Sequence, residues 1–239
     1  MRKILTYIIL LCSIAVSGQN ILERRRVASS TLPSSLIAYY KLENNTNDEE
    51  EAYNATLVGD PAYSTTKKAG SYSLYLDGTG DVIDHGNVDI GTEFTLCAWI
   101  NIDDTDTYRH IWANRSTSGT VDGFSVRIRS NGEIMFLAGD GSDESLVYTS
   151  SGVFTFDQWN WLVVTYSRTD EEVHFYLNNT DVTPTSYSIS DANTFSTDIK
   201  FVSGGLTGTY DSAIGYFDEI MLFDEVLSTT EITSIYNLY

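Results

Sequence analysis

Short apolar runs alternate with clusters of Gly, Asn and Asp along the chain after residue 35. The runs are rich in aromatic and β-branched residues, which favour strands because they pack well on a pleated, half-buried surface. Gly, Asn and Asp accept the tight turns between strands. The pattern therefore predicts strands over residues 36–42, 71–76, 82–83, 94–102, 110–113, 124–128, 134–138, 161–167, 173–177, 199–202 and 216–223. Many short strands with such spacing are typical of an all-β sandwich or jelly roll.

Two of these runs are apolar on both faces. In residues 94–100 one face is wholly apolar and the other still carries Cys97 and Trp99, and in residues 161–166 neither face is polar. A strand that buries only one face alternates apolar and polar side chains. We therefore expect both strands in the middle of a sheet. One face would lie in the core, and the other would line a groove or lie under a loop.

One short helix is predicted near the end of the chain. Ser228 and Glu231 have the spacing of a capping box, in which each side chain accepts a hydrogen bond from the backbone N–H of the other residue. Ile232, Ile235 and Tyr236 then fall on one helical face. The pattern predicts a helix that docks on the sandwich.

Residues 1–18 have the features of a secretory signal peptide. Arg2 and Lys3 precede an apolar stretch that ends in small residues suited to cleavage. The alternative is a membrane anchor, for which the stretch is short. Residues 19–35 are small and polar without periodicity, as in a linker. We expect a secreted protein with one domain over residues 36–239 and no membrane insertion after signal cleavage.

Charge and cysteine content narrow the partners and the means of stabilisation. The formal net charge is −19, and loss of the two basic residues of the signal peptide would make it −21. Nucleic acid and anionic membranes need basic surfaces, so this balance argues against both. It is compatible with calcium, neutral glycans or cationic partners, although solubility accounts for most of it. Without the signal peptide Cys97 is the single cysteine, so no intramolecular disulfide can form.

Seven segments follow one another in a recognisable order. They are residues 39–48, 73–78, 94–100, 158–166, 175–179, 214–220 and 227–236. In this order they resemble the laminin-G-like jelly-roll domains of the concanavalin A-like lectin/glucanase superfamily, and the likeness covers about residues 36–239. The resemblance implies a two-sheet antiparallel jelly-roll β-sandwich, an extracellular location, frequent calcium binding, and frequent recognition of glycans or proteins. The chain lacks the disulfide that some relatives carry.

Three aspartates lie in segments that match motifs of this family. Asp48 is in an Asn/Asp-rich loop, Asp77 ends a strand before a glycine, and Asp218 lies on a late strand. Calcium takes several oxygen ligands, including carboxylates. If the first and last strands meet, Asp48 and Asp218 would share an ion. We expect a structural calcium here. The alternative is that Asp48 caps a turn, Asp77 forms an Asx turn and Asp218 pairs with a neighbour.

Glycan binding needs an exposed aromatic platform with polar side chains beside it. Trp112 is the first candidate, because it follows a stretch in which aromatic, cationic and imidazole side chains interleave, including Arg109. Tyr148 and Tyr210 lie in loop-like stretches and would extend the rim. The alternative is that Trp112 lies in the core, where most tryptophans of a β-sandwich lie.

Signatures of catalysis are missing from the sequence. A retaining glycosidase needs two carboxylates about 5–5.5 Å apart, and alternate acids on one strand would supply them. As successive strand residues, Asp218 and Glu219 are expected on opposite faces. The sequence therefore predicts a secreted non-catalytic binding module for an extracellular glycan or glycoprotein. The alternatives are a protein-interaction or adhesion module and a glycoside hydrolase of the same superfamily.

Overall fold

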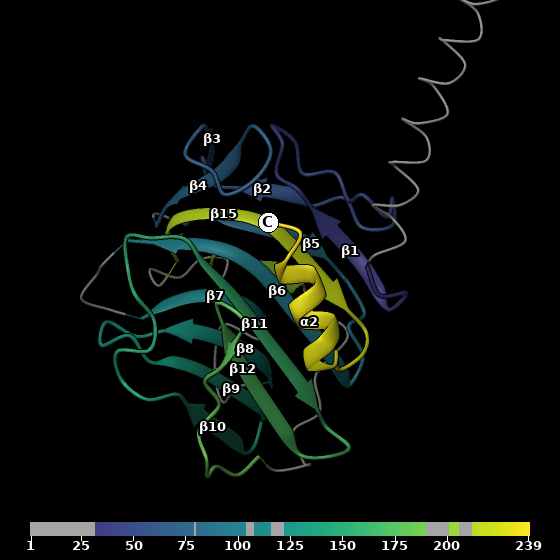
Figure 1. Cartoon of the computed structure of the whole chain (residues 1–239), viewed down its shortest axis with the longest axis vertical. Coiled ribbons are helices and arrows are strands. Elements are labelled where there is room, and N and C mark those ends of the chain that lie inside the picture. Colours follow the sequence, from purple (N-terminus) through teal and green to yellow (C-terminus); the bar gives the residue numbers. More distant parts are fainter. Residues whose placement is uncertain (1–31, 79, 104–107, 116–121, 190–200, 206–211) are drawn as a thin grey trace, which may run out of the picture. The chain divides into compact units, whose positions relative to one another are not determined.

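Strands are the main regular structure of the described chain, and one helix follows them (Figure 1). The structure is a computed structural model that describes residues 32–78, 80–103, 108–115, 122–189, 201–205 and 212–239. Its strands are β1 (Leu36–Tyr40), β2 (Thr56–Val58), β3 (Ala62–Ser64), β4 (Ser73–Asp77), β5 (Val82–Gly86), β6 (Glu93–Ile102), β7 (Arg109–Arg115), β8 (Asp122–Ile128), β9 (Ile134–Asp140), β10 (Glu144–Tyr148), β11 (Asn160–Ser167), β12 (Glu172–Leu177), β13 (Thr180–Asp181), β14 (Phe201–Ser203) and β15 (Ile214–Phe223). The helix is α2 (Thr229–Tyr236).

The strands form two antiparallel sheets. Sheet A has the order β13-β12-β11-β6-β15-β4-β3, with β1 added beside β15, and sheet B has the order β10-β9-β8-β7-β14-β5-β2. Strand β15 pairs with β6, with β4 through its first half and with β1 through its second half. The predicted fold class, an all-β two-sheet antiparallel sandwich with a short helix near the end of the chain, is confirmed.

Aromatic rings from both sheets meet in the core. Phe94 of β6 lies 4.9 Å from Phe124 of β8 and 5.3 Å from Tyr166 of β11, measured between ring centroids. Phe136 of β9 completes the group, at 5.3 Å from Tyr166. Successive side chains of a strand point to opposite faces, and each of these rings stands at a position of its strand that points inward. Their burial supplies much of the hydrophobic stabilisation of the sandwich.

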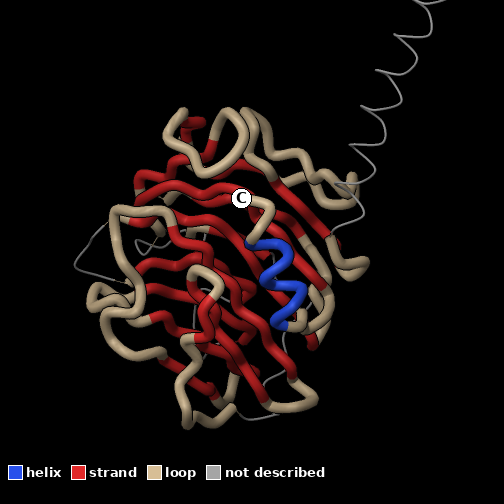
Figure 2. The backbone as a smooth tube through the Cα atoms, viewed as in Figure 1, coloured by secondary structure: helices blue, strands red, loops and turns tan. Residues whose placement is uncertain are grey.

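The predicted two-sided burial of the central strands is confirmed, and helix α2 covers their outer face (Figure 2). Tyr236 of the helix stacks on Trp99 of β6, with ring centroids 5.7 Å apart. Tyr239 lies 6.1 Å from Trp161 of β11. The cover is therefore a helix, where the sequence predicted a groove or a loop.

The helix begins as the sequence predicts. Ser228 is the N-cap, its hydroxyl accepts a hydrogen bond from the backbone N–H of Glu231, and the Glu231 carboxylate accepts one from the backbone N–H of Ser228 at 2.8 Å. Ile232 and Ile235 are buried. Among the described residues no helix is long and apolar enough to cross a membrane.

The strands that sequence patterning missed are short and carry few buried residues. They are β2, β3, β10 and β13. Tyr148, expected in a loop, is the last residue of β10. Of the predicted strand over 199–202, only 201 and 202 lie within the described residues, in β14. The proposed signal peptide and most of the linker also lie outside the described residues.

Candidate functional site

Two exposed tyrosines, one just before β7 and one at the end of β10, flank a pair of arginines. The Arg129 guanidinium carbon lies 5.2 Å from the ring centroid of Tyr108 and 5.6 Å from that of Tyr148. The guanidinium carbon of Arg127 lies 5.9 Å from the Tyr108 ring. Tyr108 and Tyr148 are 39% and 37% exposed, so ligands can reach both rings. We call these four residues the arginine–tyrosine patch.

Strand alternation aims these side chains away from the core. The neighbours of Arg127 in β8 enter the core, so Arg127 points to the outer face, and Arg129 continues the alternation into the turn before β9. Tyr148 follows the core residue Val147 at the end of β10. The register places Arg127 of β8 and Tyr148 of β10 level with each other on either side of β9, because both lie opposite Met135.

The arginine–tyrosine patch joins flat apolar surfaces to hydrogen-bond donors. Ring faces suit the C–H faces of sugars, and a guanidinium offers five N–H donors in one plane. Arg129 forms an ion pair with Glu133 at 2.7 Å, which holds the guanidinium beside the rings. Within the described residues Glu133 is the only hydrogen-bond partner of this guanidinium, so other donors remain for hydroxyl or carboxylate oxygens of a ligand.

Trp112 is not part of a surface platform. It is fully buried and belongs to the core between the sheets. A register shift between His110 and Trp112 in β7 sets its direction, and the residue opposite it is Val126, another core residue. The prediction of Trp112 as a glycan platform is therefore wrong, and its alternative, a core tryptophan, is correct.

The other predicted glycan-binding residues have different positions. Tyr148 belongs to the arginine–tyrosine patch. Arg109 is partly buried at the start of β7, opposite Ile128, and Tyr210 lies outside the described residues. Sequence reasoning missed Arg129, whose signal was the alternation of outward arginines with core residues in the β8 segment.

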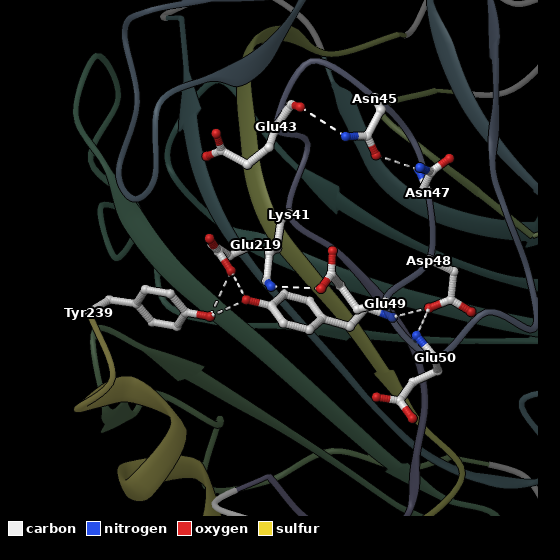
Figure 3. Close-up of polar contacts among 10 residues, drawn as sticks. Lys41, Glu43, Asn45, Asn47, Asp48, Glu49, Glu50, Glu219 and Tyr239 are labelled. Carbon is white, nitrogen blue, oxygen red and sulfur yellow. Dashed lines mark hydrogen bonds and ion pairs between the residues drawn. The ribbon is translucent and has the colours of Figure 1, made fainter. Parts of the chain in front are cut away.

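Asp48 anchors the loop after β1 through backbone hydrogen bonds (Figure 3). Its Oδ1 accepts from the N–H groups of Tyr39 at 2.8 Å and Glu50 at 3.1 Å. Its Oδ2 accepts from Ala52 at 3.0 Å and Tyr53 at 2.9 Å. Four donors fill the acceptor positions of a carboxylate. This arrangement favours the turn-capping alternative for Asp48 over a role as calcium ligand.

A β-bulge in β15 places two neighbouring acids on the same face of sheet A. Asp218 lies opposite Trp99 and Met221 lies opposite Cys97, so β15 has one extra residue here. Glu219, inside the bulge, has a φ of 53°. A bulge breaks the two-residue alternation of a strand. The expectation that Asp218 and Glu219 lie on opposite faces is therefore wrong.

Asp218 is fully buried against the loop before β4. Its Oδ2 accepts hydrogen bonds from the backbone N–H groups of Lys68 at 2.9 Å and Ala69 at 3.0 Å. Burial raises the pKa of the Asp218 carboxyl to about 7, although the two hydrogen bonds act in the opposite direction. Asp218 thus pairs with a neighbouring loop, as the alternative to metal binding predicts.

Glu219 is 4% exposed and accepts hydrogen bonds from two tyrosine hydroxyls (Figure 3). They belong to Tyr39 of β1 and to Tyr239, which follows α2 and lies 2.8 Å away. Burial raises the pKa of the Glu219 carboxyl against these hydrogen bonds. Both acids of the bulge are therefore buried and accept hydrogen bonds from groups within the protein.

Three other carboxylates converge at the edge of the sandwich. One oxygen each from Asp60, Asp77 and Asp81 lies within 4.8 Å of the others. Asp81 is buried and accepts hydrogen bonds from the backbone N–H groups of Asp60 at 2.8 Å and Asp77 at 3.0 Å. Oxygens that share a calcium lie within about 5 Å of one another, because each Ca–O distance is about 2.3–2.6 Å. The spacing fits a calcium ion.

Of the three predicted metal ligands, only Asp77 belongs to this group. Asp60 was missed, because it comes from the segment between β2 and β3 and its approach to Asp81 depends on tertiary structure. Gly59 makes that approach possible. A Cβ on Gly59 would lie 2.2 Å from Oδ1 of Asp81, and its φ of 84° also requires glycine.

The two antiparallel sheets form a jelly-roll β-sandwich. The family model described as the concanavalin A-like lectin/glucanases superfamily matches residues 77–233. The chain belongs to this superfamily, as the sequence resemblance predicted. No sequence among the curated proteins matches the chain.

Solved structures share this fold at low sequence identity. The receptor binding domain of the botulinum neurotoxin C/D mosaic serotype is 19% identical, with a TM-score of 0.66 over 85% of this chain and 51% of that one. Domain 4 of AbnA, a GH43 extracellular arabinanase from Geobacillus stearothermophilus in complex with arabinotriose, is 14% identical. Its TM-score is 0.66, over 84% of this chain and 98% of that domain.

A third structure, the binding domain of botulinum neurotoxin DC in complex with SialylT, is 16% identical, with a TM-score of 0.64 over 85% of this chain and 51% of that one. The chain spans about half the length of the neurotoxin binding domains that it matches. At these identities the likeness concerns the fold.

Proposed function

We propose that the chain is a secreted, non-catalytic module that binds extracellular carbohydrate at the arginine–tyrosine patch. The observation that carries this proposal is the Arg129 guanidinium between two exposed rings, 5.2 Å from Tyr108 and 5.6 Å from Tyr148. A sugar would stack its C–H face on a ring and accept hydrogen bonds from the guanidinium. The arginines would then distinguish one glycan from another by its hydroxyl or charged groups.

Two kinds of observation support this reading. The arabinanase domain and the neurotoxin DC binding domain, which share the fold, were solved with arabinotriose and with SialylT. The signal-peptide features of residues 1–18 favour export to the outside of the cell, where such glycans are found.

The alternatives have less support from the described residues. A hydrolase needs two accessible carboxylates, whereas Asp218 and Glu219 are 0% and 4% exposed and bonded within the protein. An adhesion module that recognises protein would use the same exposed surface, so the choice between protein and glycan falls to experiment.

The experiment is a calorimetric titration of the purified protein with a neutral probe, arabinotriose, and an acidic probe, 3′-sialyllactose. Tyr108→Ala and Tyr148→Ala should each weaken binding about two- to tenfold, since a stacked ring contributes roughly 0.5–1.5 kcal/mol. Tyr72→Ala is the matched control, because Tyr72 is 37% exposed at the start of the β4 region in the other sheet. Failure of both probes to bind, or equal binding by all variants, would reject the patch as a glycan site.

A structural calcium at Asp60, Asp77 and Asp81 is a second part of the proposal. The observation in its favour is the convergence of three carboxylates within 4.8 Å. Without a counterion these charges repel one another, and a divalent cation would offset that repulsion. The ion would fix the segment before β3 to the end of β4.

A further inference from the structure

A second aromatic surface lies on the outer face of sheet A. Tyr75 of β4 and Tyr216 of β15 are opposite each other in the register, with ring centroids 4.8 Å apart. Trp159, just before β11, lies 6.2 Å from Tyr216. All three rings are partly exposed. We call these three residues the sheet A ladder.

The rings point outward for the same reason as those of sheet B. Leu74 and Leu76 enter the core on either side of Tyr75, and Phe217 enters it beside Tyr216. The ladder therefore continues the outer face that carries Trp99, beyond the part that helix α2 covers.

Aspartates surround the sheet A ladder. Asp77 ends β4 two residues after Tyr75, and Asp103 directly follows β6. The backbone N–H of Asp157 donates to the carbonyl of Ile102 at 2.9 Å, which brings Asp157 to the same end of the sheet.

The protein itself places a cation on this face. The Lys68 ammonium lies 3.8 Å from the ring centroid of Trp99, a close cation–π contact. In contrast, no Lys or Arg of the described residues lies over a ring of the sheet A ladder. The ladder thus combines partly exposed aromatic rings with negative charge, and none of the lysines and arginines in the described ranges lies over these rings.

We propose that the sheet A ladder is a second binding site and that its ligand is a cationic oligosaccharide built from amine-bearing sugars. The three rings would take the C–H faces of successive sugars. The ammonium groups would lie over the rings and beside Asp103 and Asp157, where cation–π and ionic attraction act together. Three rings in sequence suit a repeating polymer better than a single cation. The arginines of the other patch select for hydroxyl or carboxylate groups, so the two sites differ in ligand charge.

The test is a titration of the full chain with a glucosamine trisaccharide, in a mildly acidic buffer that keeps its amines protonated, and with the fully N-acetylated trisaccharide. The charged probe should bind about tenfold more tightly than its neutral analogue. Asp157→Asn should weaken its binding, because it removes one charge at a position whose φ of 58° asparagine tolerates. Asp89→Asn removes an equal charge from an exposed position after β5 and should leave binding unchanged.

Trp159→Phe supplies an independent readout. The charged probe should quench or shift tryptophan fluorescence in the unaltered protein, and this change should be lost in the variant. Equal affinity for both trisaccharides, or unchanged affinity in Asp157→Asn and Trp159→Phe, would overturn the proposal. Binding of oligolysine without binding of the charged trisaccharide would also overturn it, in favour of a basic peptide. Arg129→Ala should leave binding at the sheet A ladder unchanged. Failure of the ladder proposal can therefore be distinguished from failure of the proposal for the arginine–tyrosine patch.

Discussion

The hydroxyl of Tyr239 donates a hydrogen bond to Glu219 Oε2 at 2.8 Å, which ties the segment after α2 to the bulge of β15. The hydroxyl of Tyr39 in β1 donates to the same oxygen. The first strand of the domain and two segments near the end of the chain therefore meet at one buried carboxylate.

Removing one of these hydroxyls should destabilise the fold. Tyr239→Phe leaves the ring in place but deprives a buried carboxylate of a donor, and hydrogen bonds to charged groups contribute roughly 1.5–3 kcal/mol. The free energy of unfolding from urea denaturation at neutral pH should fall by about that amount. Tyr236→Phe is the matched control, since Tyr236 contacts Trp99 through its ring. An equal loss in both variants would show that the hydroxyl of Tyr239 has no special role.

The bulge acids should make stability depend on pH. The pKa of Asp218 is raised from 3.8 to about 7 in the folded protein. Between these values the folded state binds a proton that the unfolded state has released, so stability falls as pH rises through this window. The raised pKa of Glu219 acts in the same direction. Groups such as Glu93 and Asp140, whose pKa values are lowered, act in the opposite direction.

A comparison with Asp218→Asn isolates the contribution of Asp218. A difference of one between the pKa values of a group in the folded and unfolded states corresponds to about 1.4 kcal/mol. Between pH 4 and pH 7.5 the original protein should therefore lose more than about 1 kcal/mol of unfolding free energy relative to the variant. Parallel pH profiles for the two proteins would contradict the raised pKa of Asp218.

Trp112 should matter for stability and not for direct contact with a ligand. Replacing a large buried aromatic residue with alanine costs about 3–5 kcal/mol, so Trp112→Ala should unfold at much lower urea concentration. Tyr108→Ala, on the surface, should stay within about 0.5 kcal/mol of the original protein. A Trp112→Ala variant that is stable but has lost glycan binding would contradict this prediction and support Trp112 as a glycan platform.

Calcium should raise the melting temperature if the carboxylates of Asp60, Asp77 and Asp81 bind it. An ion that binds only the folded state stabilises by about 2.7 kcal/mol at a hundredfold excess over Kd. A thermal melt with calcium and then with chelator should show this shift, and Asp60→Asn should remove it. Asp48→Asn should lower the melting temperature yet keep the calcium shift. No shift in the original protein would refute the calcium proposal.

Sequence patterning predicted the architecture well, because core positions such as Phe94 and Tyr166 recur with the period of a strand. It predicted the helix because Ser228 and Glu231 form a local motif. The direction of Trp112 depends on a register shift in β7 and not on alternation. A single-sequence pattern does not encode such a shift, so the alternation around Trp112 did not reveal that it enters the core.

The candidate sites depend still more on tertiary structure. Glu219 carries a positive φ that its residue type does not announce, so the bulge that joins it to Asp218 could not be foreseen. Asp60 meets Asp81 only because β2 pairs with β5 in one sheet and β3 pairs with β4 in the other. Arg129 was within reach of prediction, since it continues the outward positions of β8 from Arg127.

The position of strand β15 in sheet A also determines when sheet A can be completed during synthesis and folding. Residues 214–223 fill the place between β6 on one side and β4 and β1 on the other. The contact between Tyr39 and Glu219 spans 180 positions. During synthesis, the first strand therefore waits for nearly the whole domain before its partner emerges from the ribosome. Such distant pairings slow folding. A chain cut before residue 214 would leave sheet A in three pieces, which are β13-β12-β11-β6, β4-β3 and β1 without its partner strand.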